Sequence, residues 1–330
     1  MSNGDLINFK PEKKTYTYKG RKNKTKYPDF IKLCKMTQPE LKEYLINELV
    51  EYYDVFHGDG YIYAKGENVL LTAHMDTVHK EVVKDFYETK NGIISSPQGI
   101  GGDDRCGIYM ILTILRTTEH RPSILFCEDE EIGGVGSNKF LQLSTHAKDL
   151  ADLNFMIELD RANANDIVFY NDDNKDFHEF VANITGYKKA TGSFSDISHL
   201  CPFAKISGVN ISCGYYHAHT LEEEVNVKEM MESIKATIKL LDAAQDCEQF
   251  EYQEKKIDLF DDYYHGSYNW IFGEFSYKNS SNKIEIDISD GQTKAECIGN
   301  FLTDHPEICW NDVIDVDYTY DEDYYGLMRY

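Results

Sequence analysis

Four short apolar runs constrain the fold of this 330-residue chain more than any other feature. Each run has the length and composition of a buried strand, and helix-like segments lie between successive runs. Strands that alternate with helices predict a mainly parallel sheet with helices on both faces. We therefore predict an α/β protein with a three-layer α/β/α core. The four runs cover residues 68–73, 123–127, 154–159 and 209–213.

Other stretches carry the local patterns of helices, strands and turns. Thr37-Gln38-Pro39-Glu40 is a capping box with a proline at the start of a helix, which should extend to about Tyr52. Asn91-Gly92 is a typical hairpin turn and predicts a β-hairpin within residues 81–97. The other predicted helices are 106–115, a helix after Ser137, and 227–245; the other predicted strands are 53–56, 61–65, 167–170 and 177–184.

The charge is distributed unevenly along the chain and suggests three regions. Residues 1–30 form a basic, irregular segment, and residues 1–35 hold ten Lys or Arg against three Asp or Glu. Residues 251–330 form an acidic, tyrosine-rich appendage of unknown fold, with six Lys or Arg against eighteen Asp or Glu. Residues 31–250 form the main domain. Two interpretations of the charged ends stay open: solvated surfaces, or ends that attract each other or a partner.

Composition argues against several classes of partner. The formal net charge of −23 makes nucleic acid and anionic membranes poor partners. No apolar run reaches the roughly 18 residues of a membrane-spanning helix, and residues 1–10 lack the apolar core of a signal peptide. These two observations favour a cytoplasmic protein. The eight cysteines form no Cys-x-x-Cys pair, so we expect reduced core residues.

A residue that can bind metal follows each of the four apolar runs. His74 follows the first run, the acidic residues 128–131 the second, Asp160 the third, and His219 comes shortly after the fourth. Ligands of open α/β sheets bind beyond the carboxyl ends of the strands, so these side chains should meet. Histidines and carboxylates gathered there suit a divalent metal, zinc in particular. Two metals would need a shared carboxylate, which Asp103 in a glycine-rich loop would supply.

Asp76 lies two positions after His74, and side chains two apart on an extended chain point the same way. Its carboxylate should therefore orient either the His74 imidazole or solvent bound to the metal, as carboxylates behind metal ligands commonly do. A single His-x-Asp is a weak motif, and it gains weight here from the ligand-type residues that recur downstream.

Taken in order, these motifs resemble those of the co-catalytic zinc exopeptidases, which include leucine-type aminopeptidases, the tripeptidase and the glutamyl aminopeptidases. The resemblance covers roughly residues 68–245, which would make 31–250 a catalytic domain. Each motif is short, but five of them in the family's order are specific. The motifs are His74-Met75-Asp76-Thr77-Val78, Gly101-Gly102-Asp103-Asp104, Glu130-Glu131-Ile132-Gly133, Asp160 after an apolar strand, and His219-Thr220 followed by Glu222.

The resemblance implies a set of metal ligands. His74 and Asp160 would complete one site, and Glu131 and His219 would complete the other. Asp103 would bridge them. The implied cofactors are two divalent metal ions, most naturally zinc, with cobalt or manganese as alternatives.

The resemblance also implies which residues act beside the metals. Glu130 would be the general base that takes a proton from a metal-bridged water, and Asp76 would be the partner of His74. The peptide bond between Asp103 and Asp104 is cis in many relatives.

Spacing distinguishes the branches of the family. Asp103 follows His74 by 29 residues and His219 follows Asp160 by 59, which leaves no room for the inserted domains of the tripeptidase and glutamyl aminopeptidase branches. The compact leucine-type branch fits best, so the expected function is an aminopeptidase acting on short peptides. The alternatives are a di-zinc carboxypeptidase, an N-deacylase acting on small amides, or a non-catalytic metal-binding scaffold. An oligomer is compatible with each of these.

Three further residues are candidates for contact with the substrate. Ser195-Asp196 and His199 resemble the Ser-Asp-His segment of the leucine-type branch, although two residues intervene. Tyr216 lies close to His219 in the sequence. A purely structural role stays open for Asp196, His199 and Tyr216.

Some neighbouring residues are rivals for the assigned roles. His219 is preferred to His217 as a ligand because His-Thr-x-Glu matches the family pattern, and His79 is expected at the surface. Glu128 or Asp129 would supply the base if the register differed.

Overall fold

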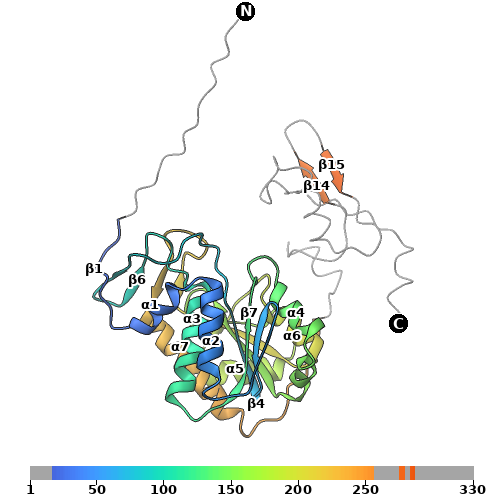
Figure 1. Ribbon diagram of the computed structural model, residues 1–330. Helices are drawn as coiled ribbons and strands as arrows, with labels where there is room; N and C mark the ends of the chain where they lie inside the picture. The colour runs from blue at the N-terminus through green and yellow to red at the C-terminus, as the bar shows by residue number, and fades with distance from the viewer. Residues whose placement is uncertain (1–16, 256–274, 279–282, 287–330) are drawn as a thin grey trace, which may run out of the picture. The chain divides into compact units, whose positions relative to one another are not determined.

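A computed structural model describes residues 17–255 and two short strands further along the chain. The chain divides into two compact units, Met1–Lys255 and Lys256–Tyr330. In the second unit, strand β14 (Phe275–Lys278) pairs antiparallel with β15 (Lys283–Ile286) (Figure 1). Most of the predicted appendage, 251–330, lies outside the described residues. Its first residues belong to the first unit, where Glu251 and Glu254 form β-bridges.

The main sheet of the first unit has eight strands in the described chain, and the four predicted apolar runs are neighbours at its centre. They form β11, β8, β4 and β7, and each pair of neighbours is parallel. The prediction of an α/β fold with a mainly parallel sheet is therefore confirmed for this centre. From edge to edge the strands are β10 (Lys188–Lys189), β9 (Asp166–Val168), β11 (Gly208–Ser212), β8 (Phe155–Arg161), β4 (Glu67–His74), β7 (Pro122–Cys127), β3 (Tyr61–Ala64) and β2 (Val55–Gly58).

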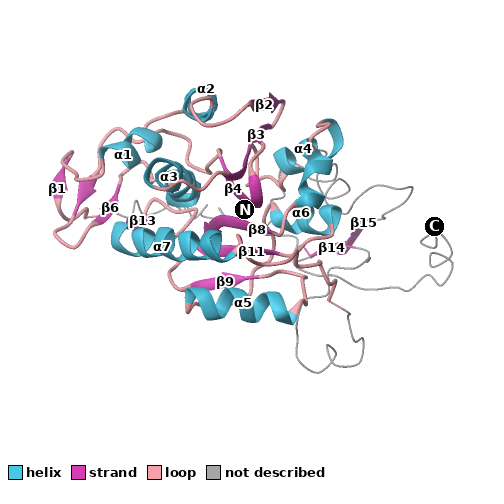
Figure 2. Cartoon of the chain, turned by 90° about the horizontal axis from the view of Figure 1, so that it is seen from below, coloured by secondary structure: helices cyan, strands magenta, loops and turns pink. Residues whose placement is uncertain are grey.

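Helices cover both faces of this sheet (Figure 2). Side chains alternate along β4, so Leu71 and Ala73 pack in one apolar cluster while Leu70 packs in the other. Two separate cores result, one on each face. The first face carries α1 (Pro28–Cys34), α2 (Gln38–Leu49), α3 (Gly102–Thr117), α5 (Lys175–Thr185) and α7 (Val227–Ala243); the second carries α4 (Val135–Leu143), the 3₁₀ helix η1 (Ala147–Asp152) and α6 (Ile197–Ala204).

Helix α3 lies unusually close to β8, and Gly107 explains why. A Cβ atom added at Gly107 would lie 1.8 Å from the carbonyl oxygen of Leu159, so no larger residue fits there. This contact brings the first residues of α3 beside the end of β8. The end of β8 carries Asp160, and the start of α3 carries Asp103.

A second, five-stranded antiparallel sheet was not predicted from the sequence. It contains the predicted hairpin, whose strands pair as expected but are shorter than the range 81–97. The sheet also frames the loop that carries His219, which connects β12 to β13. Its strands are β1 (Arg21–Lys22), β5 (Tyr87–Glu88), β6 (Ile93–Ser95), β13 (Glu224–Asn226) and β12 (Tyr215–Tyr216).

The prediction of a strand at 177–184 was wrong, because these residues belong to helix α5. Phe177, Phe180, Val181 and Ile184 follow helical rather than strand spacing, and all four pack in the first core. The Asn174 side chain accepts a hydrogen bond from the Phe177 backbone N–H and caps the helix.

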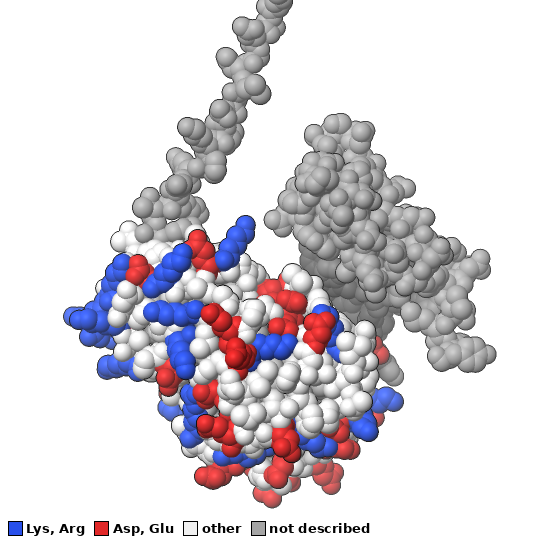
Figure 3. Space-filling model, in the orientation of Figure 1, with Lys and Arg blue, Asp and Glu red and all other residues white. Residues whose placement is uncertain are grey.

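The basic N-terminal segment is also less irregular than predicted. Within residues 1–30 the described part contains β1 and the start of α1, whereas residues 1–16 lie outside the described residues. Exposed Lys and Arg side chains gather at the end of the unit that carries β1 (Figure 3).

The cysteines agree with the prediction where they are described. Five of the six described cysteines are buried, and all six are free thiols. Cys297 and Cys309 lie outside the described residues. Among the helices of the described chain, none is both long and apolar enough to cross a membrane.

Candidate metal centre

His74 is the last residue of β4, and its imidazole is almost fully buried (1% exposed). The alternation of β4 turns its side chain away from the first core. Its Nδ1 atom lies 3.1 Å from Asp76 Oδ1. Its Nε2 atom faces two carboxylates, 3.0 Å from Asp103 Oδ1 and 3.3 Å from Asp160 Oδ1.

Asp103 lies between the two histidines. Its Oδ1 atom faces His74, and its Oδ2 atom lies 3.2 Å from His219 Nε2. The same His219 nitrogen lies 3.1 Å from Glu131 Oε2. The five predicted ligands, including Asp160 beside His74, therefore come together from five different segments of the chain.

Asp76 holds both sides of the centre. Besides facing His74, its Oδ1 accepts a hydrogen bond from the backbone N–H of Glu130, and its Oδ2 accepts one from that of Glu131. Asp76 therefore orients the imidazole and also fixes the backbone of the two glutamates.

The loop before α3 is held by two carboxylates. The Asp103–Asp104 peptide bond is cis, as the resemblance implied. Asp104 accepts hydrogen bonds from the backbone N–H groups of His74 and Gly107, which occupy its two oxygens. Glu223 accepts hydrogen bonds from the backbone N–H groups of Gly101 and Asp103.

Glu223 is fully buried and was missed by the sequence analysis, which singled out its exposed neighbour Glu222. The His79 Nε2 atom lies 2.5 Å from Glu223 Oε2. His79 therefore contacts this carboxylate and is not a free surface residue as expected. The run of three consecutive glutamates, Glu222 to Glu224, offered no way to choose among them. Only the fold shows which of the three reaches the loop of Asp103.

Asp160 is positioned by the neighbouring strand β11, by the segment just before α6 and by β12. The Ser195 hydroxyl donates to Asp160 Oδ2 over 3.1 Å, and the backbone N–H of Asp160 donates to Asn210 Oδ1 over 3.0 Å. The Tyr215 hydroxyl donates to its carbonyl oxygen. These contacts leave the Oδ1 atom of Asp160 directed at His74.

Crowding of carboxylates shifts their proton affinities. Burial, with the charge of Asp160 nearby, raises the pKa of Glu130 to about 9. Burial and the charge of Asp103 raise the pKa of Glu131 to about 7. Burial also raises the pKa of Asp160 to about 6. Although burial opposes it, hydrogen bonding to His219 and His74 holds the pKa of Asp103 well below its usual range.

The pKa values of the two histidines are also raised, which favours their charged forms. The hydrogen bond to Asp103, together with the charge of Glu131, raises the pKa of His219 to about 9 although burial opposes the shift. The pKa of His74 lies well above its usual value, because Asp160, Asp103 and Asp76 outweigh its burial. Both imidazoles thus act as the positive charges among these carboxylates.

These residues fit divalent cations. Glu131 Oε1 and Asp160 Oδ1 are buried and lack a hydrogen-bond partner among the described residues. Two carboxylates also converge on the Nε2 atom of each histidine, where a single N–H can serve only one well. Two sets of three residues bring their ligand atoms close enough together to hold a metal ion. One set is His74, Asp104 and Asp160, and the other is His74, Asp103 and Glu131.

The three predicted substrate contacts lie in different surroundings, and their contact with a substrate stays a prediction. Asp196 is fully buried, and its two carboxylate oxygens have no hydrogen-bond partner among the described residues. The Tyr216 hydroxyl donates to Glu229 of α7 over 2.6 Å and is thus engaged within the protein. His199 is half-buried and accepts a hydrogen bond at Nδ1 from Asn138, with its ring against Phe194, and its contact with substrate stays a prediction.

The rival residues lie elsewhere. Glu128 forms an ion pair with Lys42 at 2.7 Å and accepts a hydrogen bond from Gly60 N–H, which removes it from the centre. His217 is exposed and makes no contact with the four buried ligand candidates among the interactions found.

Residues 60–198 match the sequence model of Peptidase family M28. The matched range contains His74, Asp103, Glu131 and Asp160. This confirms the resemblance to the co-catalytic zinc exopeptidases. On the basis of this family match, the chain is a metallopeptidase, which is a class of hydrolase. No curated protein matched the chain.

Solved structures agree at the level of fold. Aminopeptidase PepT from Bacillus cereus superposes with a TM-score of 0.54 at 13% identity, covering 66% of this chain and 98% of that one. A tripeptidase from Staphylococcus aureus superposes with a TM-score of 0.53 at 14% identity, covering 65% of this chain and 96% of that one. The α/β fold of the first unit is thus that of known exopeptidases.

Proposed function

We propose that this protein is an aminopeptidase that hydrolyses short peptides with two divalent metal ions, most naturally zinc. The observation that carries the proposal is the position of Asp103, whose two oxygens face His74 and His219 at 3.0 and 3.2 Å. A carboxylate between two histidines is suited to hold two cations at once. In this proposal residues 31–250 are a three-layer α/β/α catalytic domain, with residues 251–330 as an acidic appendage.

The ligand assignment follows the contacts. His74 and Asp160 would hold one cation, Glu131 and His219 the other, and Asp103 both. We prefer Asp103 to Asp104 as the bridge because two backbone N–H groups already occupy the Asp104 oxygens. When bound, the cations would make water more acidic and stabilise negative charge on the carbonyl oxygen of the substrate.

Glu130 is the proposed general base. Its backbone is fixed by Asp76, its neighbour Glu131 faces His219, and its carboxyl group is largely buried beside Asp160. A carboxylate in this position accepts a proton from the attacking water and returns it to the leaving amine. The raised pKa of Glu130 would fall once positive charge balances Asp160, which leaves it ionised for this role.

The general base is tested by comparing Glu130→Gln with Asp129→Asn. Glu130→Gln keeps the shape of the side chain, and we expect kcat to fall by about 10²–10⁴-fold with metal content unchanged. Asp129→Asn is the matched control, because Asp129 has a positive φ of 59° that Asn tolerates. Turnover that survives in Glu130→Gln would refute the mechanism.

Blocked peptides test which end of the substrate is recognised. Acetylation of the N-terminus should abolish release of the first residue by an aminopeptidase, whereas amidation of the C-terminus should not. The reverse result would indicate the carboxypeptidase alternative, and activity only on acylated amino acids would indicate an N-deacylase. A metal-loaded protein without activity on a broad peptide library would indicate a scaffold.

A further inference from the structure

The five candidate ligands differ sharply in how they are held. The side chains of His74, Asp103, Glu131 and Asp160 are at most 11% exposed, whereas that of His219 is 54% exposed. His74 and Asp160 lie at the ends of two strands of the main sheet, Asp76 holds the Glu131 backbone, and Glu223 holds the Asp103 backbone. His219 depends instead on its own loop, residues 217–223, and on whatever holds that loop in place.

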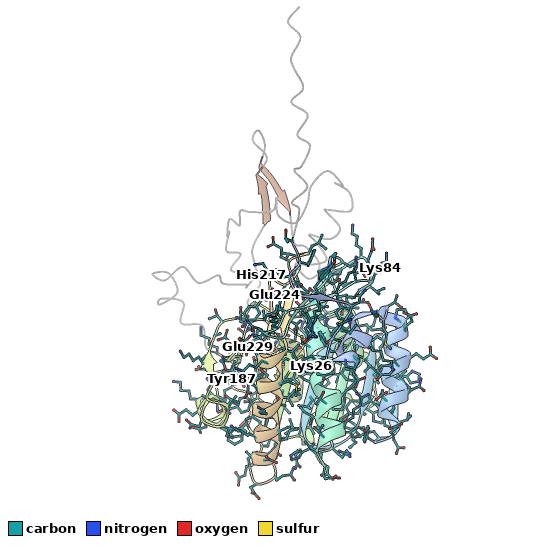
Figure 4. All side chains as sticks on the ribbon, turned by 90° about the vertical axis from the view of Figure 1, so that its left-hand side faces the viewer. Lys26, Lys84, Tyr187, His217, Glu224 and Glu229 are labelled. Carbon is teal, nitrogen blue, oxygen red and sulfur yellow. The ribbon has the colours of Figure 1, made fainter. Side chains whose placement is uncertain are left out.

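The supporting strands of this loop are short. Tyr215–Tyr216 leads into it and Glu224–Asn226 leads out of it. Figure 4 labels His217, the first residue of the loop, and Glu224, the residue that follows its last. Internal hydrogen bonds from Thr220 Oγ1 to the His217 carbonyl and from Glu223 N–H to the Thr220 carbonyl form a turn but do not attach it to the rest of the protein.

Besides the contacts of His219 with Asp103 and Glu131 and the packing of Ala218 against the first core, two contacts attach the loop. At its end, the buried Glu223 side chain anchors it to the loop of Asp103. Near its middle, the Leu221 carbonyl accepts a hydrogen bond from the Tyr18 hydroxyl over 3.2 Å. Leu221 lies two residues from His219, so this second contact acts close to the ligand.

Tyr18 belongs to an N-terminal arm, residues 17–26, that lies along β5. Its ring stacks on Tyr87, with 5.5 Å between the ring centroids and 20° between the planes. The backbone of Gly20 passes so close to β5 that an added Cβ would lie 2.3 Å from the Glu88 carbonyl oxygen. The arm is thus pressed closely against the strand.

Polar contacts further along hold the same arm. Lys22 forms an ion pair with Asp85 at 2.8 Å, and Asn23 exchanges hydrogen bonds with the backbone of Phe86. The arm therefore presents the Tyr18 hydroxyl from a fixed position. Its attachment does not depend on the loop that Tyr18 contacts.

We propose that Tyr18 is a positioning residue for His219, through which the N-terminal arm sets the affinity of the centre for the cation on the His219 side. The inference rests on the proposed two-cation function. It assigns a role at the active centre to a segment that lies outside residues 60–198, the range of the family match. The cation on the His74 side depends less on Tyr18, because His74 and Asp160 are buried at the ends of two strands of the main sheet.

A zinc titration of the full-length, metal-free protein tests this inference. We compare the wild type with Tyr18→Phe, which keeps the ring and removes the hydroxyl, and with Tyr18→Ala, which removes both. Tyr27→Phe is the matched control, since it removes a hydroxyl next to the same arm. In Tyr18→Phe the affinity for the weaker-bound ion should fall about two- to tenfold, the effect of one net hydrogen bond, with the tighter ion unaffected.

The same variants should show a further pattern in activity. Excess zinc should restore kcat in Tyr18→Phe, because the loop is loosened but every ligand remains. Unchanged affinity for both ions in Tyr18→Phe and Tyr18→Ala would overturn the inference. An equal loss at both ions would also overturn it, because it would indicate general destabilisation.

Hydrogen exchange of the metal-free protein separates this inference from the proposed function. The segment 217–223 should exchange faster in Tyr18→Phe than in the wild type or Tyr27→Phe, whether or not the protein is an aminopeptidase. Unchanged exchange there would refute the positioning role even if two zinc ions bind. A wild type that binds fewer than two ions would instead refute the two-cation function on which the affinity claim rests.

Discussion

The Glu223 carboxylate lies 3.0 Å from the backbone nitrogen of Asp103, although 120 residues separate them in the sequence. The same carboxylate accepts a hydrogen bond from Gly101 N–H, so it fixes the loop that presents the proposed bridging ligand. A buried carboxylate that holds a ligand's backbone controls where that ligand lies.

Replacement of this carboxylate should therefore weaken both metal binding and the fold. Glu223→Ala leaves two buried N–H groups without an acceptor, at a cost of about 1–3 kcal/mol each in the free energy of unfolding. Thermal unfolding and zinc titration measure the two effects. Glu222→Ala is the control, because Glu222 is exposed, and it should change neither quantity appreciably.

Asp76 connects His74 with the backbone of Glu130, so Asp76→Asn should impair catalysis without unfolding the protein. The amide retains the size of the side chain but no longer accepts at both oxygens. We expect metal affinity or kcat/KM to fall about 10- to 100-fold, as for other partners of metal-bound histidines. Steady-state kinetics at saturating zinc, with circular dichroism as the folding control, would reveal this. Full activity in Asp76→Asn would contradict the assigned role.

Metal binding should release protons at pH 7. In the metal-free protein the pKa of His219 is about 9 and that of Glu131 about 7, so the first is largely protonated and the second about half protonated. Cations bind the deprotonated forms, so zinc affinity should rise as the pH increases from 7 to 9. Calorimetry in buffers of different ionisation enthalpy counts the released protons. His219→Ala should release fewer protons, and a pH-independent affinity would contradict the scheme.

The core on the first face should be sensitive to truncation. Leu71 is fully buried in β4, and Leu71→Ala should lower the free energy of unfolding by about 2–5 kcal/mol. Val50→Ala serves as the control because Val50 is 56% exposed. Denaturant unfolding monitors both variants. Equal midpoints for the two would show that β4 does not support this core.

The parts of the fold that were predictable carry their information locally. Strands β4, β7, β8 and β11 are buried on both faces. Such strands appear in the sequence as nearly uninterrupted runs of apolar residues. The candidate ligands follow these runs directly, so their meeting at one edge was predictable from topology. Their distances in the structure agree with this, while their roles as ligands stay a prediction.

The remaining features depend on contacts between distant segments. The five-stranded sheet joins β1, β5 and β13, whose short pairings leave no periodic pattern. Helix α5 was mistaken for a strand because its apolar residues are mostly aromatic or β-branched, types common in strands. The neighbouring sequence could not predict that Asp196 is buried, or that Glu223 and not Glu222 contacts the loop of Asp103. Both features depend on which distant segment packs beside these residues.

The alternation of side chains along β4 has a consequence beyond packing. Leu71 and Ala73 point to one face, and His74, the next residue, points to the other. A single residue inserted into this strand would exchange the two sets and turn the imidazole into the first core. Natural variation in length should therefore be confined to the loops around β4. An insertion within the strand would disrupt both the packing of the first core and the position of His74 in the metal centre.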